Sequence, residues 1–339
     1  MNRRLTAIAV FSVAMTVGAT AAATTDASSA RLAGANRFET AQIVTTETFD
    51  AANVALLVNG MNYPDALAAS YLAGITGSPV LLTDPTTLSD GIIPTLEALG
   101  VNGVYAIGGE GAISSAVLNE LQAAGYIVDR IAGENRFSTA RQVAELAGPD
   151  PIGEFMAGRA AIVVNGLSFP DALAAGPIAA AHGLPILLTT PEALHPDAEN
   201  ALLNLEIEQA LIVGGTAAVS EAVAGRIDTL GIDVRRISGP TRQETAARVA
   251  EVAVGELAFP ADRVLLARSD NAADALAGGI RGGTVLAPIL LTDSRDELGS
   301  AAGAFILDNR ATLARIEALG GTSGISDGVL AAAVELARS

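Results

Sequence analysis

The stretch RLAGANRFETA, residues 31–41, decides how this chain is organised, because it returns twice. RIAGENRFSTA occupies residues 130–140 and RISGPTRQETA occupies residues 236–246. All three copies keep two arginines and a threonine at the same places. The copies begin about 100 residues apart, which is the size of a small domain and too long for one unit of a solenoid.

Three further landmarks recur in the same order within each copy. NGMNYPDALAA at 59–69 returns as NGLSFPDALAA at 165–175 and as RSDNAADALAG at 268–278. An LLT segment ends at residues 83, 189 and 292, and a Gly-Gly turn follows at 108–109, 214–215 and 320–321. The repeats predict three modules, at residues 24–129, 130–235 and 236–339.

The alternation of segment types within a copy indicates the fold. In the first copy, apolar runs at 31–34, 54–60, 79–84 and 103–109 alternate with helix-like segments at 37–49, 64–76, 89–100 and 114–125. Apolar strands that alternate with helices predict a parallel sheet covered on both faces. We therefore expect an α/β fold of three flavodoxin-like, doubly wound modules around a pseudo-threefold axis. An eightfold βα barrel is disfavoured, because sets of four units repeat three times.

Composition excludes several classes of protein. The net charge is −17 and all 20 basic residues are arginines, which argues against nucleic acid as a partner. The absence of lysine favours a GC-rich, actinobacterial source. Without cysteine there are no disulfides or thiolate metal sites. His182 and His195 have no second histidine at helical spacing, so neither a metal site nor a cofactor is expected.

The N-terminus has the layout of a secretory signal peptide. Arg3 and Arg4 precede an apolar run from Leu5 to Val17, and small residues follow up to Ala23. The run is shorter than the ~20 residues that a membrane helix needs. Residues 1–23 are therefore predicted to be removed on export, which leaves a secreted protein of the cell wall or cell surface with no membrane partner.

The polar residues of the repeated motif form the candidate ligand site. Its second arginine stands at a predicted helix start, where a guanidinium beside unpaired N–H groups can hold an anion. The alternative is that each arginine pairs with a recurring aspartate and locks one module to the next. The candidate residues are Arg31, Arg37, Thr40, Arg130, Arg136, Thr139, Arg236, Arg242, Thr245, Asp65, Asp171 and Asp274.

Other chemistry has little support in the sequence. The Gly-Gly turns lack the G-x-G-x-x-G spacing of a dinucleotide site. Neither G-x-S-x-G nor H-E-x-x-H is present. No catalytic residue is predicted, and we expect that the chain is not an enzyme.

The motif series, from Arg31 to the C-terminus, resembles the cell-wall-binding repeat 2 family. The resemblance implies three α/β modules in a pseudo-threefold triangle that hold surface proteins on Gram-positive envelopes without a covalent bond. In clostridial members the partner is an anionic wall polysaccharide. The motif positions in this chain would be Arg31, Arg37, Thr40, Pro79, Leu81, Leu82 and their counterparts.

The resemblance leaves some questions open. Some family members carry an amidase, protease or adhesin domain, for which the signal peptide and three modules leave no room here. The third copy departs most, with Gln243, Arg268 and Ala273 at motif positions. Local arginines or bridging calcium would have to offset the acidic charge on an anionic polymer. The alternatives are an extracellular α/β enzyme or small-ligand binder, and a self-assembling surface layer; the oligomeric state stays open.

Overall fold

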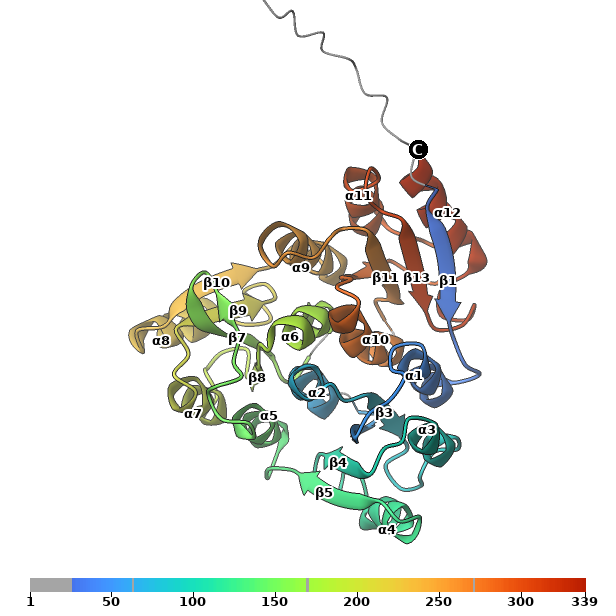
Figure 1. Ribbon diagram of the computed structural model, residues 1–339. Coiled ribbons are helices and arrows are strands. Elements are labelled where there is room, and N and C mark those ends of the chain that lie inside the picture. Colours follow the sequence, from blue (N-terminus) through green and yellow to red (C-terminus); the bar gives the residue numbers. More distant parts are fainter. Residues whose placement is uncertain (1–25, 63, 169–170, 271) are drawn as a thin grey trace, which may run out of the picture.

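Three parallel sheets, one per module, lie around the sides of a triangle (Figure 1). The computed structural model describes residues 26–62, 64–168, 171–270 and 272–339, so the predicted signal peptide lies outside the description. Module I contains β2 (Val54–Asn59), β3 (Val80–Thr83), β4 (Gly103–Ile107) and β5 (Ile127–Ile131). Module II contains β7 (Gly158–Asn165), β8 (Ile186–Thr189), β9 (Gln209–Val213) and β10 (Asp233–Ile237). Module III contains β11 (Arg263–Arg268), β12 (Ile289–Thr292), β13 (Arg315–Leu319) and β1 (Ser28–Leu32).

The strand order is the same in every sheet. It runs β3-β2-β4-β5 in module I, β8-β7-β9-β10 in module II and β12-β11-β13-β1 in module III. All of these pairings are parallel. The order reverses next to the first strand, as it does in flavodoxin-like sheets. The predicted fold class is therefore confirmed.

The sheets are one strand out of phase with the sequence repeats. The RLAG strand, expected to join the other strands of the first repeat, is β1, which pairs with β13 so that Arg31 lies opposite Ala318. Likewise β5 and β10, which begin the second and third repeats, complete the sheets of modules I and II. Each sheet thus takes its last strand from the next repeat, and β1 closes the ring.

The helices begin where local side chains satisfy their first N–H groups. Asn36 accepts from the N–H groups of Phe38 and Glu39, and Asn135 and Thr241 cap the equivalent helices. The helices are α1 (Arg37–Thr46), α2 (Pro64–Thr76), α3 (Ile92–Ala98), α4 (Ser115–Ala123), α5 (Arg136–Glu145), α6 (Gly176–His182), α7 (Pro196–Asn204), α8 (Glu221–Thr229), α9 (Arg242–Glu256), α10 (Ala272–Thr284), α11 (Ser300–Asp308) and α12 (Asp327–Arg338). In the described ranges, none is long and apolar enough to cross a bilayer.

Module II differs from its neighbours at two places. Gly176 and Pro177 stand where α2 has Ser70 and Tyr71, and the helix there divides into the 3-10 helix η1 (Asp171–Ala175) and α6. Proline supplies no N–H to the preceding turn, which explains the break. A short antiparallel strand, β6 (Glu154–Phe155), also pairs with the start of β7.

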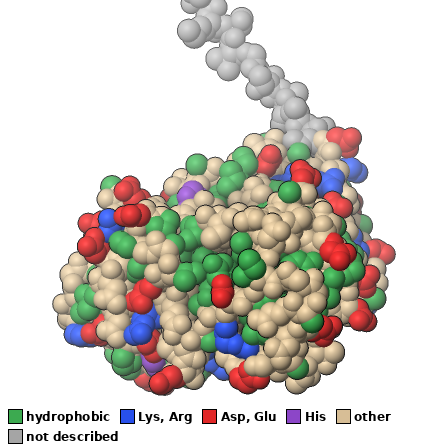
Figure 2. Space-filling view, turned by 60° about the horizontal axis from the view of Figure 1, so that its bottom comes forward, with side chains coloured by type: hydrophobic (Ala, Val, Ile, Leu, Met, Phe, Trp, Pro, Cys, Tyr) green, Lys and Arg blue, Asp and Glu red, His purple; other side chains and the backbone are tan. Residues whose placement is uncertain are grey.

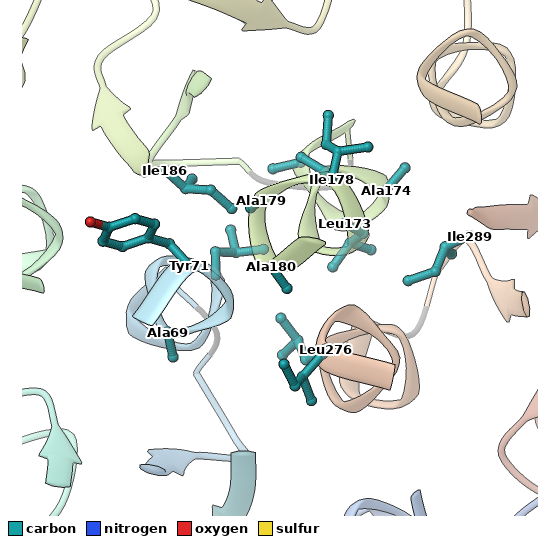
Figure 3. Packing of buried hydrophobic residues seen from close by; sticks show 14 of the residues in the cluster. Ala69, Tyr71, Leu173, Ala174, Ile178, Ala179, Ala180, Ile186, Leu276 and Ile289 are labelled. Atoms are coloured by element: carbon teal, nitrogen blue, oxygen red, sulfur yellow. The ribbon is translucent and has the colours of Figure 1, made fainter. Parts of the chain in front are cut away.

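The centre of the triangle is a hub of α2, α6 and α10 (Figure 3). Small residues let these helices approach closely: a Cβ added to Gly176 would lie 2.9 Å from the Cα of Gly279 and 3.3 Å from the Ser70 hydroxyl. Tyr71, Leu173 and Leu276 pack in one buried cluster that all three modules share. Three smaller clusters cover the outer faces of the sheets. The hub therefore fixes the modules relative to one another.

Candidate functional site

The carboxyl ends of the strands in each sheet point toward the next module around the triangle (Figure 1). At each of these ends lie the Gly-Gly turn of one repeat and the capped helix start of the following repeat. Crevices outside the carboxyl ends of parallel strands are the usual binding position in open α/β sheets. We call these three places the inter-repeat crevices.

Each inter-repeat crevice brings together an aspartate and an arginine from different repeats. The guanidinium groups of Arg136, Arg242 and Arg37 act on the carboxyl groups of Asp65, Asp171 and Asp274 respectively. The third pair joins the last repeat to the first. The structure thus repeats one electrostatic arrangement three times, and the third copy depends on ring closure.

The same arginines also contact the neighbouring module. Nη1 of Arg37 donates to the carbonyl oxygen of Gly60 at 3.0 Å, Arg136 to that of Gly166 at 2.8 Å, and Arg242 to that of Ser269 at 3.1 Å. These carbonyls follow β2, β7 and β11. Each arginine therefore helps to join two modules.

The aspartates lie directly over the Gly-Gly turns. A Cβ on Gly108 would come within 2.6 Å of Asp65 Oδ2, and one on Gly320 within 2.3 Å of Asp274 Oδ2. Both glycines have positive φ, +113° and +93°. These positions need glycine both for its backbone conformation and for the close approach of the carboxylate.

The motif threonines shape the floor of the crevices. Thr40, Thr139 and Thr245 are buried, and the hydroxyl oxygen of each accepts the N–H of the motif glycine six residues earlier, at 3.1 Å. The loop between strand and helix is thereby held tightly closed. Thr245 also hydrogen-bonds to the Asp171 carboxyl group, which lowers its pKa.

Burial governs the charge of the three aspartates. It raises the pKa of Asp65 to about 6 against the opposing effect of Arg136. It also raises the pKa of Asp171, although Arg242 and Thr245 oppose it, and that of Asp274, although Arg37 and Arg268 oppose it. Asp65 Oδ1 is buried and has no hydrogen-bond partner among the described residues. These three carboxyl groups are therefore protonated at a higher pH than ordinary carboxyl groups.

The first arginine of each motif lies elsewhere, on the last strand of each sheet. Arg31, Arg130 and Arg236 donate through Nη1 to the carbonyl oxygens of Gly320, Gly108 and Gly214, at 2.9, 2.7 and 3.0 Å. Their Nη2 groups pair with Asp327, Glu110 and Glu221. These arginines brace the Gly-Gly turns from the adjacent strand.

Two of the crevices are open cavities. The one between Asp65 and Arg136 measures about 210 Å³, and the one between Asp171 and Arg242 about 560 Å³. Nη1 of Arg136 and of Arg242 is used on a carbonyl, and their Nε and Nη2 groups donate to no atom of the described chain. These donors can receive an anionic or hydroxyl-bearing ligand.

The face of the molecule that Figure 2 draws has no broad basic field. In Figure 2, basic side chains form small groups that acidic side chains border. Among the described residues, no group of three His, Cys, Asp or Glu is placed to hold a metal ion. Attraction for an anion would therefore be local.

The structure thus separates the predicted site residues into two sets. Nine of them, the three aspartates, the second arginines and the threonines, gather in the inter-repeat crevices, while Arg31, Arg130 and Arg236 lie on the adjacent strands. Sequence reasoning missed the Gly-Gly turns as walls of the site. The positive φ that a glycine pair permits was the available signal.

Fold and crevices define an α/β protein of three modules with one repeated site between successive repeats. The chain belongs to the cell wall binding domain 2 (CWB2) family, whose model matches residues 31–118, 130–224 and 236–330. The family expected from the motif series is confirmed.

Relatives of known name share part of their length with this chain. It is 30% identical over 271 residues to the N-acetylmuramoyl-L-alanine amidase LytC and 34% identical over 296 residues to the amidase enhancer, both of Bacillus subtilis. These matches cover 80% and 87% of this chain but 51% and 39% of the relatives. The chain therefore spans about half of their length or less.

Two solved structures of Clostridium difficile proteins are similar in fold. Cwp6 superposes with a TM-score of 0.80 and 25% identity, over 92% of this chain and 48% of Cwp6. Cwp8 superposes with a TM-score of 0.77 and 26% identity, over 91% of this chain and 52% of Cwp8. Membership of the family and these neighbours support binding to the cell wall.

Proposed function

We propose that this chain is a secreted, non-catalytic protein that attaches non-covalently to an anionic polysaccharide of a Gram-positive wall through its three repeats. The observation that carries the proposal is the threefold recurrence of a crevice in which one repeat supplies the aspartate and the next supplies the arginine. A polymer presents the same unit many times, and three equivalent sites on one rigid body can bind it multivalently.

The construction of the crevices favours a binding protein over an enzyme. An enzyme needs its acid, base or nucleophile concentrated in one site, with the catalytic groups within hydrogen-bond reach of one another. Here the titratable groups are distributed over three similar crevices, and each arginine also bonds to a backbone carbonyl. The amidase names belong to relatives of which the matches to this chain cover only 51% and 39%, so the proposal includes no amidase activity.

Anion binding is supported by arginine N–H groups that donate to no atom within the described ranges. Nε and Nη2 of Arg136 and Arg242 line crevices of sufficient size for a polymer unit. Over more than about 8–10 Å, salt at physiological strength screens the repulsion from the acidic surface. The net charge of −17 therefore does not prevent a phosphate or carboxylate group from binding to these arginines at short range.

Sedimentation with purified walls tests the proposal. The full chain is mixed with intact Gram-positive walls and with walls from which the anionic polymers have been extracted by acid. We expect retention on intact walls, release after extraction, and weaker retention as sodium chloride rises. Equal retention on both preparations would contradict binding to the polymer, and retention that does not respond to salt would contradict an anionic ligand.

A further inference from the structure

A second kind of cavity lies on the first repeat, outside the inter-repeat crevices. It has a volume of about 550 Å³, is open to solvent, and lies between the start of α1 and the loop that follows β3. Phe38 and Leu88 form its apolar part. Its polar lining includes Gln42, Ser89 and the carboxylates of Glu39 and Asp84. We call it the Phe38 pocket.

Module II shows what fills the corresponding space. A Cβ added to Gly166 would meet the ring of Phe137 at 2.7 Å, just as one added to Gly60 would meet the ring of Phe38 at 2.6 Å. On Phe137 the imidazole of His195 is stacked, with ring centroids 4.0 Å apart and an interplanar angle of 12°. In the second repeat, a flat ring of the chain itself therefore covers the phenylalanine.

The residue equivalent to His195 in the first repeat is Ser89. The N–H of Ser89 donates to Thr83 Oγ1 at 3.2 Å, and the N–H of His195 donates to Thr189 Oγ1 at 2.9 Å, each from the same place in its loop. A serine has no ring to lay on Phe38. The space that the His195 ring occupies in module II is therefore part of the Phe38 pocket in the first repeat.

The polar lining identifies the chemistry of a ligand. Glu39 Oε2 accepts from Ala35 N–H, and Asp84 Oδ1 accepts from Thr86 and Thr87. Glu39 Oε1 and Asp84 Oδ2 accept no hydrogen bond from the described residues. Three carboxylates line the pocket, with no basic side chain among the described lining residues. The pocket therefore suits hydroxyl donors and rejects anions.

We propose that the Phe38 pocket binds one uncharged sugar ring, a hexose or an N-acetylhexosamine, whose flat face lies on Phe38 where His195 lies on Phe137. This inference rests on the proposed function, because it names an uncharged sugar as a unit of the wall polymer. The pocket is within the size range of small-ligand sites. The first repeat thereby binds an uncharged sugar ring of the polymer, while the inter-repeat crevices bind its anionic groups.

Two variants copy states that the chain already uses elsewhere. Ser89→His places an imidazole over Phe38, as in the second repeat, and Phe38→Gln removes the ring, as in the third, where Gln243 occupies the equivalent position. Both residues are tolerated in those modules. Thermal unfolding of each variant establishes that it folds before binding is measured.

The experiment is saturation-transfer NMR on the full chain, titrated with glucose, N-acetylglucosamine and, as the anionic control, glucuronate. We expect at least one uncharged sugar to bind, glucuronate to bind more weakly, and both variants to lose roughly tenfold in affinity, the size of effect that a lost ring contact gives. No binding of either uncharged sugar, or native affinity in a folded Ser89→His chain, overturns the inference. Sugar binding without wall retention would instead contradict the proposed function and leave the pocket standing.

Discussion

Asp65 of the first repeat and Arg136 of the second line one crevice, and the guanidinium opposes the burial that raises the pKa of the Asp65 carboxyl group to about 6. Each of the two residues therefore has its electrostatic partner in a different repeat. The crevice therefore forms only when the repeats assemble, and the contact between modules determines the protonation of the Asp65 carboxyl group.

Replacing Asp65 by asparagine should change how stability depends on pH. The folded-state pKa of Asp65 lies above its ordinary value of 3.8, so the native chain binds the proton more tightly than the unfolded chain. The stability that protonation supplies is complete below the unfolded pKa and is lost as pH rises through about 6. We expect Asp65→Asn to be more stable than the native chain by about 1–3 kcal/mol at pH 7 and equal to it near pH 4.

Urea unfolding at several pH values measures this difference. Asp50→Asn, at an exposed aspartate outside the crevices, is the matched control and is measured at the same pH values. A constant difference for Asp65→Asn from pH 4 to pH 7 would contradict the raised pKa.

Glu317 should be the most sensitive ionisable residue outside the crevices. It is 1% exposed on β13, and Arg281, Arg263 and Arg315 surround it at 2.8, 3.1 and 3.5 Å. Burial raises its pKa, but these arginines outweigh burial and lower it. Glu317→Gln leaves buried Arg281 uncompensated, so we expect a loss of about 3–5 kcal/mol in the free energy of unfolding.

The control is Glu251→Gln, which removes an exposed partner of Arg248 and should leave the unfolding midpoint nearly unchanged. Because the folded-state pKa of Glu317 is lowered, its contribution is present above the unfolded pKa and is lost as pH falls through the folded one. Similar midpoints for the two variants at pH 7 would show that the buried cluster is not stabilising.

A circular permutant tests the closure of the ring by β1. Arg338 Nε donates to Ala27 O at 2.9 Å, so the C-terminal helix lies beside the start of β1. Moving residues 26–34 behind Ser339 through a short linker gives module III its four strands in one continuous segment. We expect this permutant to fold with a stability within about 1–2 kcal/mol of the native chain, because the termini of a domain tolerate such rejoining.

Deleting residues 26–34 is the companion measurement, and it should unfold module III by exposing the edge of β13 and removing the Arg31–Gly320 contact. A deletion variant as stable as the permutant would mean that β1 does not complete the sheet.

Local patterns were sufficient to predict the strands, the helices and the threefold repeat. They could not tell which sheet the RLAG strand joins, because Arg31 and Leu32 read as strand in either position and the partner, β13, is distant in sequence. The pairing of the motif arginines with the recurring aspartates stayed one of two alternatives, because the sequence does not show which repeat supplies the aspartate that each arginine meets. The turn before β7 was also missed, since Met156 and Ala157 have positive φ where glycine or asparagine is expected.

Two buried or pocket-lining features correspond to single residues that are visible in the sequence but were not predicted from it. Glu317 stands in a strand that is otherwise apolar from Ile316 to Leu319, which marks a buried charge that needs partners. The exchange of Ser89 for His195 opposite a shared phenylalanine marks the Phe38 pocket. Neither feature can be interpreted from the sequence alone, because the arginines around Glu317 and the phenylalanine beneath His195 are identified only in the structure.

Wall retention by a charge-neutralised crevice variant tests the central claim most directly. Arg136→Gln with Arg242→Gln removes two crevice charges, and Arg248→Gln with Arg295→Gln removes two charges from exposed surface positions. With folding of each checked by circular dichroism, we predict that the crevice variant loses at least roughly tenfold in affinity for intact walls, while the surface variant binds like the native chain. Equal binding by the two variants would contradict attachment through the inter-repeat crevices.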